Sequence, residues 1–78
     1  MNALIENIDK LHTTELGVVR IKRNLGLKDD DVVAWCRESI LSPDCFTERK
    51  GKNWYAEIDG CRITVNAHSY TIITAHRV

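Results

Sequence analysis

The sequence predicts an α+β fold, a two-layer sandwich in which two or three N-terminal helices pack on one face of a four-stranded antiparallel meander. Apolar residues recur at helical spacing before Pro43, and the period changes to two after Cys45. The pair Asp59-Gly60, between two alternating runs, is the strongest short-range signal for a β-hairpin. We therefore expect one domain over residues 1–78, with a helical half at 1–43 and a sheet at 44–78.

Cap residues divide the helical half into segments. Each expected helix follows a residue whose side chain can accept a hydrogen bond from the first turn: Asn2, then Thr13 or Thr14, then Asp29. Gly26 follows the second helix, where a left-handed C-cap belongs, and Pro43 closes the third. The helices would supply these apolar residues to the core: Leu4, Ile5, Ile8, Leu11, Leu16, Val18, Val19, Ile21, Leu25, Val32, Val33, Cys36 and Ile40.

The turn at Asp59-Gly60 fixes the register of the central hairpin. On one face it opposes apolar residues: Ile58 with Cys61, Ala56 with Ile63, and Trp54 with Val65. On the other face it opposes polar ones: Glu57 with Arg62, Tyr55 with Thr64, and Asn53 with Asn66. Because an opposite-charge pair and a clean apolar set arise together, this register is well supported.

The two flanking turns are expected from weaker signals. Lys50-Gly51-Lys52 suits a three-residue loop with Gly51 in the left-handed region, and Ala67-His68 is taken as a two-residue turn. These loops would set the following neighbours: Phe46 opposite Ala56, Arg49 on the polar face, Thr71 opposite Thr64, and Ile73 opposite Arg62.

Since helices need to cover one side of such a sheet, the polar side is left open. We expect it to carry Arg49, Tyr55, Glu57, Arg62, Thr64 and Thr71, rimmed by Asn53, Asn66 and His68. Two interpretations stand: a solvated face with a Glu57–Arg62 ion pair, as on any one-sided sheet, or a binding surface. Ile73 breaks the polar pattern, as a partner contact or as a tolerated exposed side chain.

Charge and cysteine content narrow the choice of partner and compartment. Eleven basic and eleven acidic residues cancel, which argues against a protein that coats DNA and favours a protein partner over nucleic acid. Three cysteines without a C-x-x-C pair predict free thiols in a reducing cytoplasm. No apolar run approaches the roughly 20 residues that span a bilayer, so we expect no membrane association.

The sequence predicts no metal and no cofactor. Three carboxylates at residues 29–31 suit the first turn of a helix better than a cation site, because no further acidic ligand recurs at a fixed spacing. His68 and His76 lie eight residues apart, roughly 26 Å along a strand, so they cannot share one metal. No phosphate-binding loop, glycine fingerprint or zinc motif is present.

Several segments resemble a small bacterial family of domains of unknown function, found mainly in Gram-positive species. They include Leu11-His12-Thr13-Thr14-Glu15-Leu16-Gly17, Lys50-Gly51-Lys52-Asn53-Trp54-Tyr55 and residues 20–25, 30–33, 35–36, 63–66 and 69–76. The likeness covers nearly the whole chain and implies no activity. A looser likeness, in the order of elements and a few residue types, is to the barnase/EndoU/colicin/RelE-type ribonuclease toxins, which cut RNA from an open sheet face without metal.

The sequence therefore favours a cytoplasmic interaction module that binds, regulates or inhibits a protein through its open sheet face or an edge strand. The contact residues would be Arg49, Tyr55, Arg62, Thr64, Thr71 and Ile73. The alternative is a metal-independent endoribonuclease, with His76 or Glu57 as acid or base and Arg62 and Arg49 on the phosphate. A homodimer through the sheet is a third option, because the core of so short a chain is small.

Overall fold

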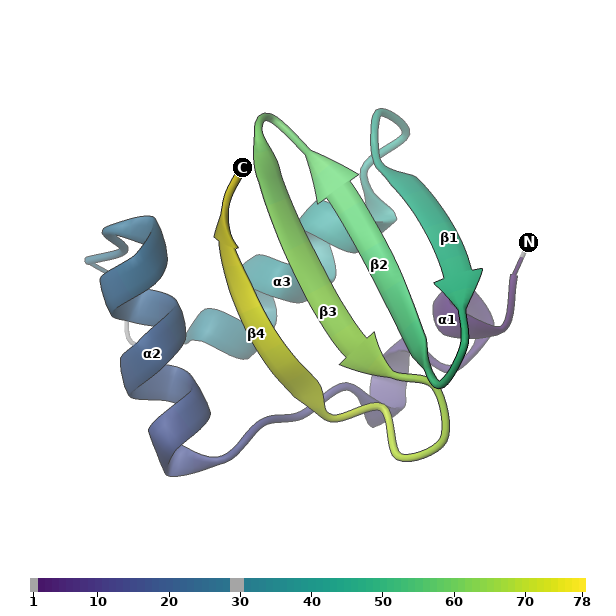
Figure 1. The fold of residues 1–78 in the computed structure, drawn as a ribbon, viewed down its shortest axis with the longest axis horizontal. Coiled ribbons are helices and arrows are strands. Elements are labelled where there is room, and N and C mark those ends of the chain that lie inside the picture. Colours follow the sequence, from purple (N-terminus) through teal and green to yellow (C-terminus); the bar gives the residue numbers. More distant parts are fainter. Residues whose placement is uncertain (1, 29–30) are drawn as a thin grey trace.

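A computed structural model describes residues 2–28 and 31–78, and it confirms the predicted α+β fold (Figure 1). Within these residues the elements are α1 (Ala3–Glu6), the 3-10 turn η1 (Ile8–Lys10), α2 (Glu15–Leu25), α3 (Val32–Leu41), β1 (Phe46–Lys50), β2 (Asn53–Ile58), β3 (Cys61–Asn66) and β4 (Ile72–Arg77). The strands form one antiparallel sheet in the order β1-β2-β3-β4. In Figure 1, α1 and α3 lie behind the sheet, whereas α2 runs beside β4.

The helices begin at polar side chains, as predicted. Asn2, Thr14 and Asp31 each accept a hydrogen bond from the backbone N–H three residues later, at 2.9, 3.0 and 3.0 Å respectively. Asp29, the expected third cap, lies outside the described residues, and Asp31 caps α3 instead. Gly26 closes α2 with φ 65°, in the left-handed C-cap expected of it.

One apolar core lies between the sheet and the helices. Its largest fully buried side chains are Leu4, Ile21, Ile40, Ile63, Ile72, Val32, Val65 and Cys36. Burying a side chain of the Val, Leu or Ile class contributes about 1.5–3 kcal/mol. Leu16 and Val19, expected on the inner face of α2, are 67% and 50% exposed, because α2 flanks the sheet and meets the core only along a narrow stripe.

The central hairpin has the predicted register. Asp59 and Gly60 both have positive φ, 50° and 73°, as a type I′ turn requires. All six expected pairs between β2 and β3 are present, from Asn53 opposite Asn66 to Ile58 opposite Cys61.

The predicted three-residue loop between β1 and β2 is wrong. Gly51-Lys52 is a two-residue turn that sets Lys50 opposite Asn53, and Gly51 takes φ 61°. Because side chains alternate along a strand, the shift by one residue turns every side chain of β1 to the other face. Arg49 therefore lies opposite Trp54 on the helix side, and Phe46 lies opposite Glu57 on the open side.

The predicted two-residue turn between β3 and β4 is also wrong. Asn66 Oδ1 accepts hydrogen bonds at 2.9 Å from the backbone N–H groups of both His68 and Ser69, which closes a longer turn. A bulge beside Thr64 then shifts the register. The resulting open-face pairs are Thr74 opposite Thr64, where Thr71 was expected, and His76 opposite Arg62, where Ile73 was expected.

The two edges of the sheet differ. At β4, the backbone N–H of Ile72 donates to the His12 carbonyl at 2.7 Å and the Ile72 carbonyl accepts from Thr13 Oγ1 at 2.9 Å. Asn24 Nδ2, from α2, donates to the Ala75 carbonyl at 3.3 Å. At β1, Asn2 Nδ2 donates a hydrogen bond to the side-chain Oγ1 of Thr47 at 2.6 Å, and not to the backbone of the strand. The backbone of β4 is thus covered on its outer side and that of β1 is not.

Among residues 2–28 and 31–78, the structure has no helix that combines the length and the apolar character needed to cross a bilayer.

Candidate functional site on the open sheet face

The open face is the side of the sheet that no helix of the described chain covers (Figure 1). Residues paired across neighbouring strands share a face, so the registers place its side chains in rows. The first row is Phe46, Glu57, Arg62 and His76, the second is Glu48, Tyr55, Thr64 and Thr74, and the third is Lys50, Asn53 and Asn66.

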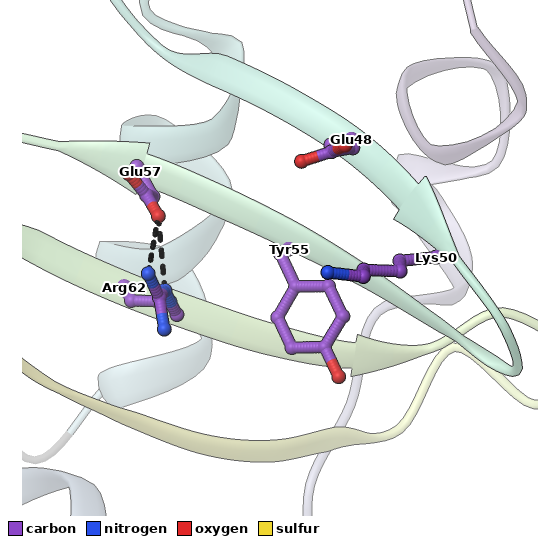
Figure 2. A pocket seen from close by; sticks show the side chains of 5 residues that line it. All are labelled: Glu48, Lys50, Tyr55, Glu57 and Arg62. Atoms are coloured by element: carbon purple, nitrogen blue, oxygen red, sulfur yellow. Dashed lines mark hydrogen bonds and ion pairs between the residues drawn. The ribbon is translucent and has the colours of Figure 1, made fainter.

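An ion pair lies at the centre of the first row. Arg62 Nη2 and Nε donate to the same oxygen, Glu57 Oε1, at 2.7 and 3.0 Å (Figure 2). The side chains of Arg62 and Glu57 are 41% and 43% exposed, so solvent screens the pair, and its contribution to stability is at most about 1 kcal/mol. The pair therefore serves mainly to orient Arg62, whose remaining N–H groups stay available for another acceptor.

A hollow of about 300 Å³ opens beside this pair, lined by Glu48, Lys50, Tyr55, Glu57 and Arg62. Figure 2 shows the Tyr55 ring extending from β2 across β3, between the ion pair and the end of Lys50. Within the described chain, Glu48 and Lys50 make no ion pair. Two carboxylates and two cations line the hollow, so its formal charge sums to zero.

The observed register adds His76 to the first row. Its imidazole, partly buried, lies on the strand next to Arg62, on the side away from Glu57. A carboxylate and an imidazole therefore flank one guanidinium across three strands. From the sequence His76 is a candidate acid or base, but the expected two-residue turn before β4 puts Ile73, not His76, opposite Arg62.

The observed registers bring five residues to the open face that were not expected there: Phe46, Glu48, Lys50, Thr74 and His76. Phe46 is the one large apolar side chain among them. It is 62% exposed, one position diagonal from Tyr55 on the neighbouring strand. The signal for it is Gly51: a glycine as the first central residue favours a two-residue type II′ turn, and that turn puts Phe46 on the open face.

Only some of the predicted contact residues lie on the open face. Tyr55, Arg62 and Thr64 lie on it, although Thr64 is only 7% exposed. Ile73 lies at the bulge and is 45% exposed. Arg49 faces the helix side. It also lines a second hollow of about 470 Å³, with Lys52, Asn66, Ala67 and His68.

Thr71 belongs to a separate network at the end of the sheet. Its Oγ1 lies 3.1 Å from His12 Nε2 and 2.8 Å from Ser69 Oγ. The other imidazole nitrogen of His12, Nδ1, lies 2.8 Å from the Lys10 carbonyl, and therefore carries a proton that it donates there. Thr71 thus fastens the β3–β4 turn to the segment before α2 and does not reach the open face.

Neither metal ligation nor thiol chemistry is indicated in this part of the molecule. No group of three or more His, Cys, Asp or Glu within residues 2–28 and 31–78 is placed to hold a metal ion. The cysteines at 36, 45 and 61 are free thiols. Burial raises the pKa of Cys36 to about 12 and also raises the pKa of Cys45, which disfavours the reactive thiolate.

Comparison with known proteins gives a family whose function is unknown. A family model described as "Protein of unknown function (DUF3781)" matches residues 5–76, a range that contains every residue of the open face. No curated protein and no solved structure matches this chain.

Proposed function

The chain belongs to the DUF3781 family of proteins of unknown function, and from the geometry of the open face we propose that it is an interaction module that binds another protein. The observation that carries this proposal is the exposed Phe46 ring on an uncovered sheet face, next to Tyr55 and the mixed-charge hollow. Exposed apolar groups rimmed by polar ones are typical of interaction sites.

The charges of the hollow favour a protein over a nucleic acid. A phosphate backbone that approached Lys50 and Arg62 would also meet the carboxylates of Glu48 and Glu57, and the chain as a whole carries no net positive charge. A protein surface can match both signs. Aromatic and arginine side chains within a polar rim are the usual anchors of such interfaces. The partner would thus offer an apolar recess for Phe46, with charges of both signs around it.

Binding of a purified partner to matched variants tests this proposal. The partner is first captured with the wild-type chain, purified and titrated by calorimetry against Phe46→Ala, Arg62→Ala and the control Leu16→Ala. Loss of a central anchor costs about 2 kcal/mol or more, roughly thirtyfold in affinity. We expect that loss for Phe46→Ala and a clear loss for Arg62→Ala.

Leu16 is a matched control because its exposure, 67%, is close to the 62% of Phe46, but it lies on α2. Equal binding by the wild type and both open-face variants would reject the open face as the binding site. If Leu16→Ala alone lowered the affinity for the partner, the binding site would lie on α2.

A second function is favoured by the row Glu57, Arg62 and His76. In a metal-independent endoribonuclease, one flanking group takes the proton of the ribose 2′-hydroxyl, and the resulting oxygen attacks the phosphorus. The other group gives a proton to the departing 5′-oxygen, which leaves a 2′,3′-cyclic phosphate. The free N–H groups of Arg62 would hold the phosphate oxygens.

Incubation of the protein with single-stranded RNA in excess chelator tests that alternative. Cleavage that His76→Ala abolishes and His68→Ala preserves would establish the ribonuclease, since His68 is exposed but lies in the β3–β4 turn. The expected loss is at least about a hundredfold, as for removal of a general acid or base. Intact RNA after prolonged incubation with folded wild-type protein would rule the ribonuclease out.

We further propose that the protein works in the cytoplasm. The support is its cysteine usage: the thiols at 36, 45 and 61 are all free, as is usual in a reducing compartment.

A further inference from the structure

The uncovered edge of β1 has a defined set of outward groups. The two-residue turn makes Lys50 and Asn53 the hydrogen-bonded closing pair of the hairpin, so Glu48 and Phe46 also bond to β2. The backbone groups of Thr47 and Arg49 therefore point away from β2. No other described segment bonds to them, in contrast to the covered backbone of β4.

In one antiparallel register, the charged side chains of β1 would lie opposite charges of the other sign on a second copy of β1. Glu48 and Lys50 are exposed, share the open face and are two residues apart. If a second β1 runs antiparallel with Arg49 opposite Arg49, each Glu48 lies opposite Lys50 of the other copy. Those two positions are non-hydrogen-bonded pairs, in which side chains approach most closely. A shift of two residues would instead oppose Glu48 to Glu48.

We propose that β1 pairs antiparallel with β1 of a second copy, in the register that opposes Glu48 to Lys50, and so joins two sheets into one. The pairing depends on the strand edge and stands independently of what the open face binds. It places Lys50 of the second copy beside Glu48, which lines the hollow. The two open faces then form a continuous surface with a hollow on either side of the two-fold axis.

The dimer is a weak one. The two copies of Arg49 are directly opposite each other on the helix side, and like charges in that position are destabilising. Arg49 Nε donates to the Gly51 carbonyl at 3.0 Å, which turns the guanidinium toward its own hairpin turn. The edge is also short and charged, features that limit indiscriminate strand pairing. Affinity is therefore expected in the micromolar to millimolar range.

Charge reversal on β1, followed by sedimentation equilibrium over that concentration range, tests the register. Glu48→Lys and Lys50→Glu each convert both intermolecular pairs to like charges, and each is expected to weaken the dimer at least about tenfold. An equimolar mixture of the two variants restores opposite charges in both pairs, and so does the double variant Glu48→Lys/Lys50→Glu. Both are expected to dimerise as the wild type does. Arg49→Thr removes the central repulsion and is expected to tighten the dimer.

Arg20→Glu is the matched control, because it reverses an exposed cation on α2, beside the opposite edge, and is expected to leave the dimer unchanged. A folded wild type that stays monomeric throughout would overturn the proposal. A dimer that survives both single reversals, or a mixture that fails to restore association, would do the same.

Discussion

At the scale of single residues, the three thiols differ in access to solvent. Cys36, on the inner face of α3, is fully buried, and burial raises its pKa to about 12 from an ordinary value of 9.0. Cys61 is 6% exposed, and Cys45, just before β1, is only partly buried. Because the thiolate is the reactive species, both access and ionisation disfavour reaction at Cys36.

We therefore expect alkylation of the native protein to label Cys45 first and Cys36 last. Iodoacetamide at mildly alkaline pH, quenched at intervals and followed by peptide mass spectrometry, measures the order. In denaturant the three thiols are expected to react at similar rates, which controls for intrinsic reactivity. Labelling of Cys36 as fast as Cys45 in the native protein would contradict the packing described for α3.

At the scale of elements, Gly17 permits the close approach of α2 to the segment that covers β4. A Cβ at position 17 would collide with Thr13 Oγ1, which donates to the Ile72 carbonyl. Elsewhere in an exposed helix, alanine would stabilise by about 1 kcal/mol relative to glycine. Here the collision opposes that gain, so the helix carries glycine where its propensity alone would favour another residue.

Gly17→Ala is therefore expected to destabilise the protein by about 1–3 kcal/mol, the range of an overpacked site. In a Thr13→Ala background the collision with the hydroxyl is gone, and the same substitution is expected to be neutral or stabilising. Urea denaturation of the four proteins in this cycle measures both effects. Equal costs of Gly17→Ala in the two backgrounds would show that Thr13 is not the obstacle.

The turns decided which elements could be predicted from sequence. A type I′ turn requires positive φ at both central residues, and Asp-Gly is one of the few pairs that adopt it readily. Asp59-Gly60 therefore indicates a two-residue turn, which leaves a single register for β2 and β3. Gly51 is compatible with either a two-residue or a three-residue loop, and the choice of the longer loop inverted the faces of β1. The turn before β4 is closed by the Asn66 side chain, a contact that alternation of apolar residues does not reveal.

At the scale of the whole molecule, the existence of an open sheet face could be predicted from the sequence, but not the full set of residues that lie on it. The uncovered side of the sheet and its centre, Tyr55, Glu57, Arg62 and Thr64, follow from the one strong turn. The open-face residues of the two outer strands, β1 and β4, do not follow from it, because an error in register displaces every residue of a strand. For that reason alone, the face contains five residues that the sequence did not predict there: Phe46, Glu48, Lys50, Thr74 and His76. Arg49 and Thr71, which were expected on it, lie elsewhere.

In the proposed dimer, the contacts that cover the outer side of β4 would also limit how many copies can join. Pairing through β1 uses the uncovered edge of each chain, so a two-fold assembly is complete at two copies and cannot grow. Thr13 holds β4 from 59 residues away in the chain. If residues 12–13 and Asn24 both left β4, each chain would present an edge on both sides, and sheets could add end to end without limit. In the proposed dimer, the segment before α2 would thus hold the assembly at two copies, although it lies in the half of the chain that contributes no strand.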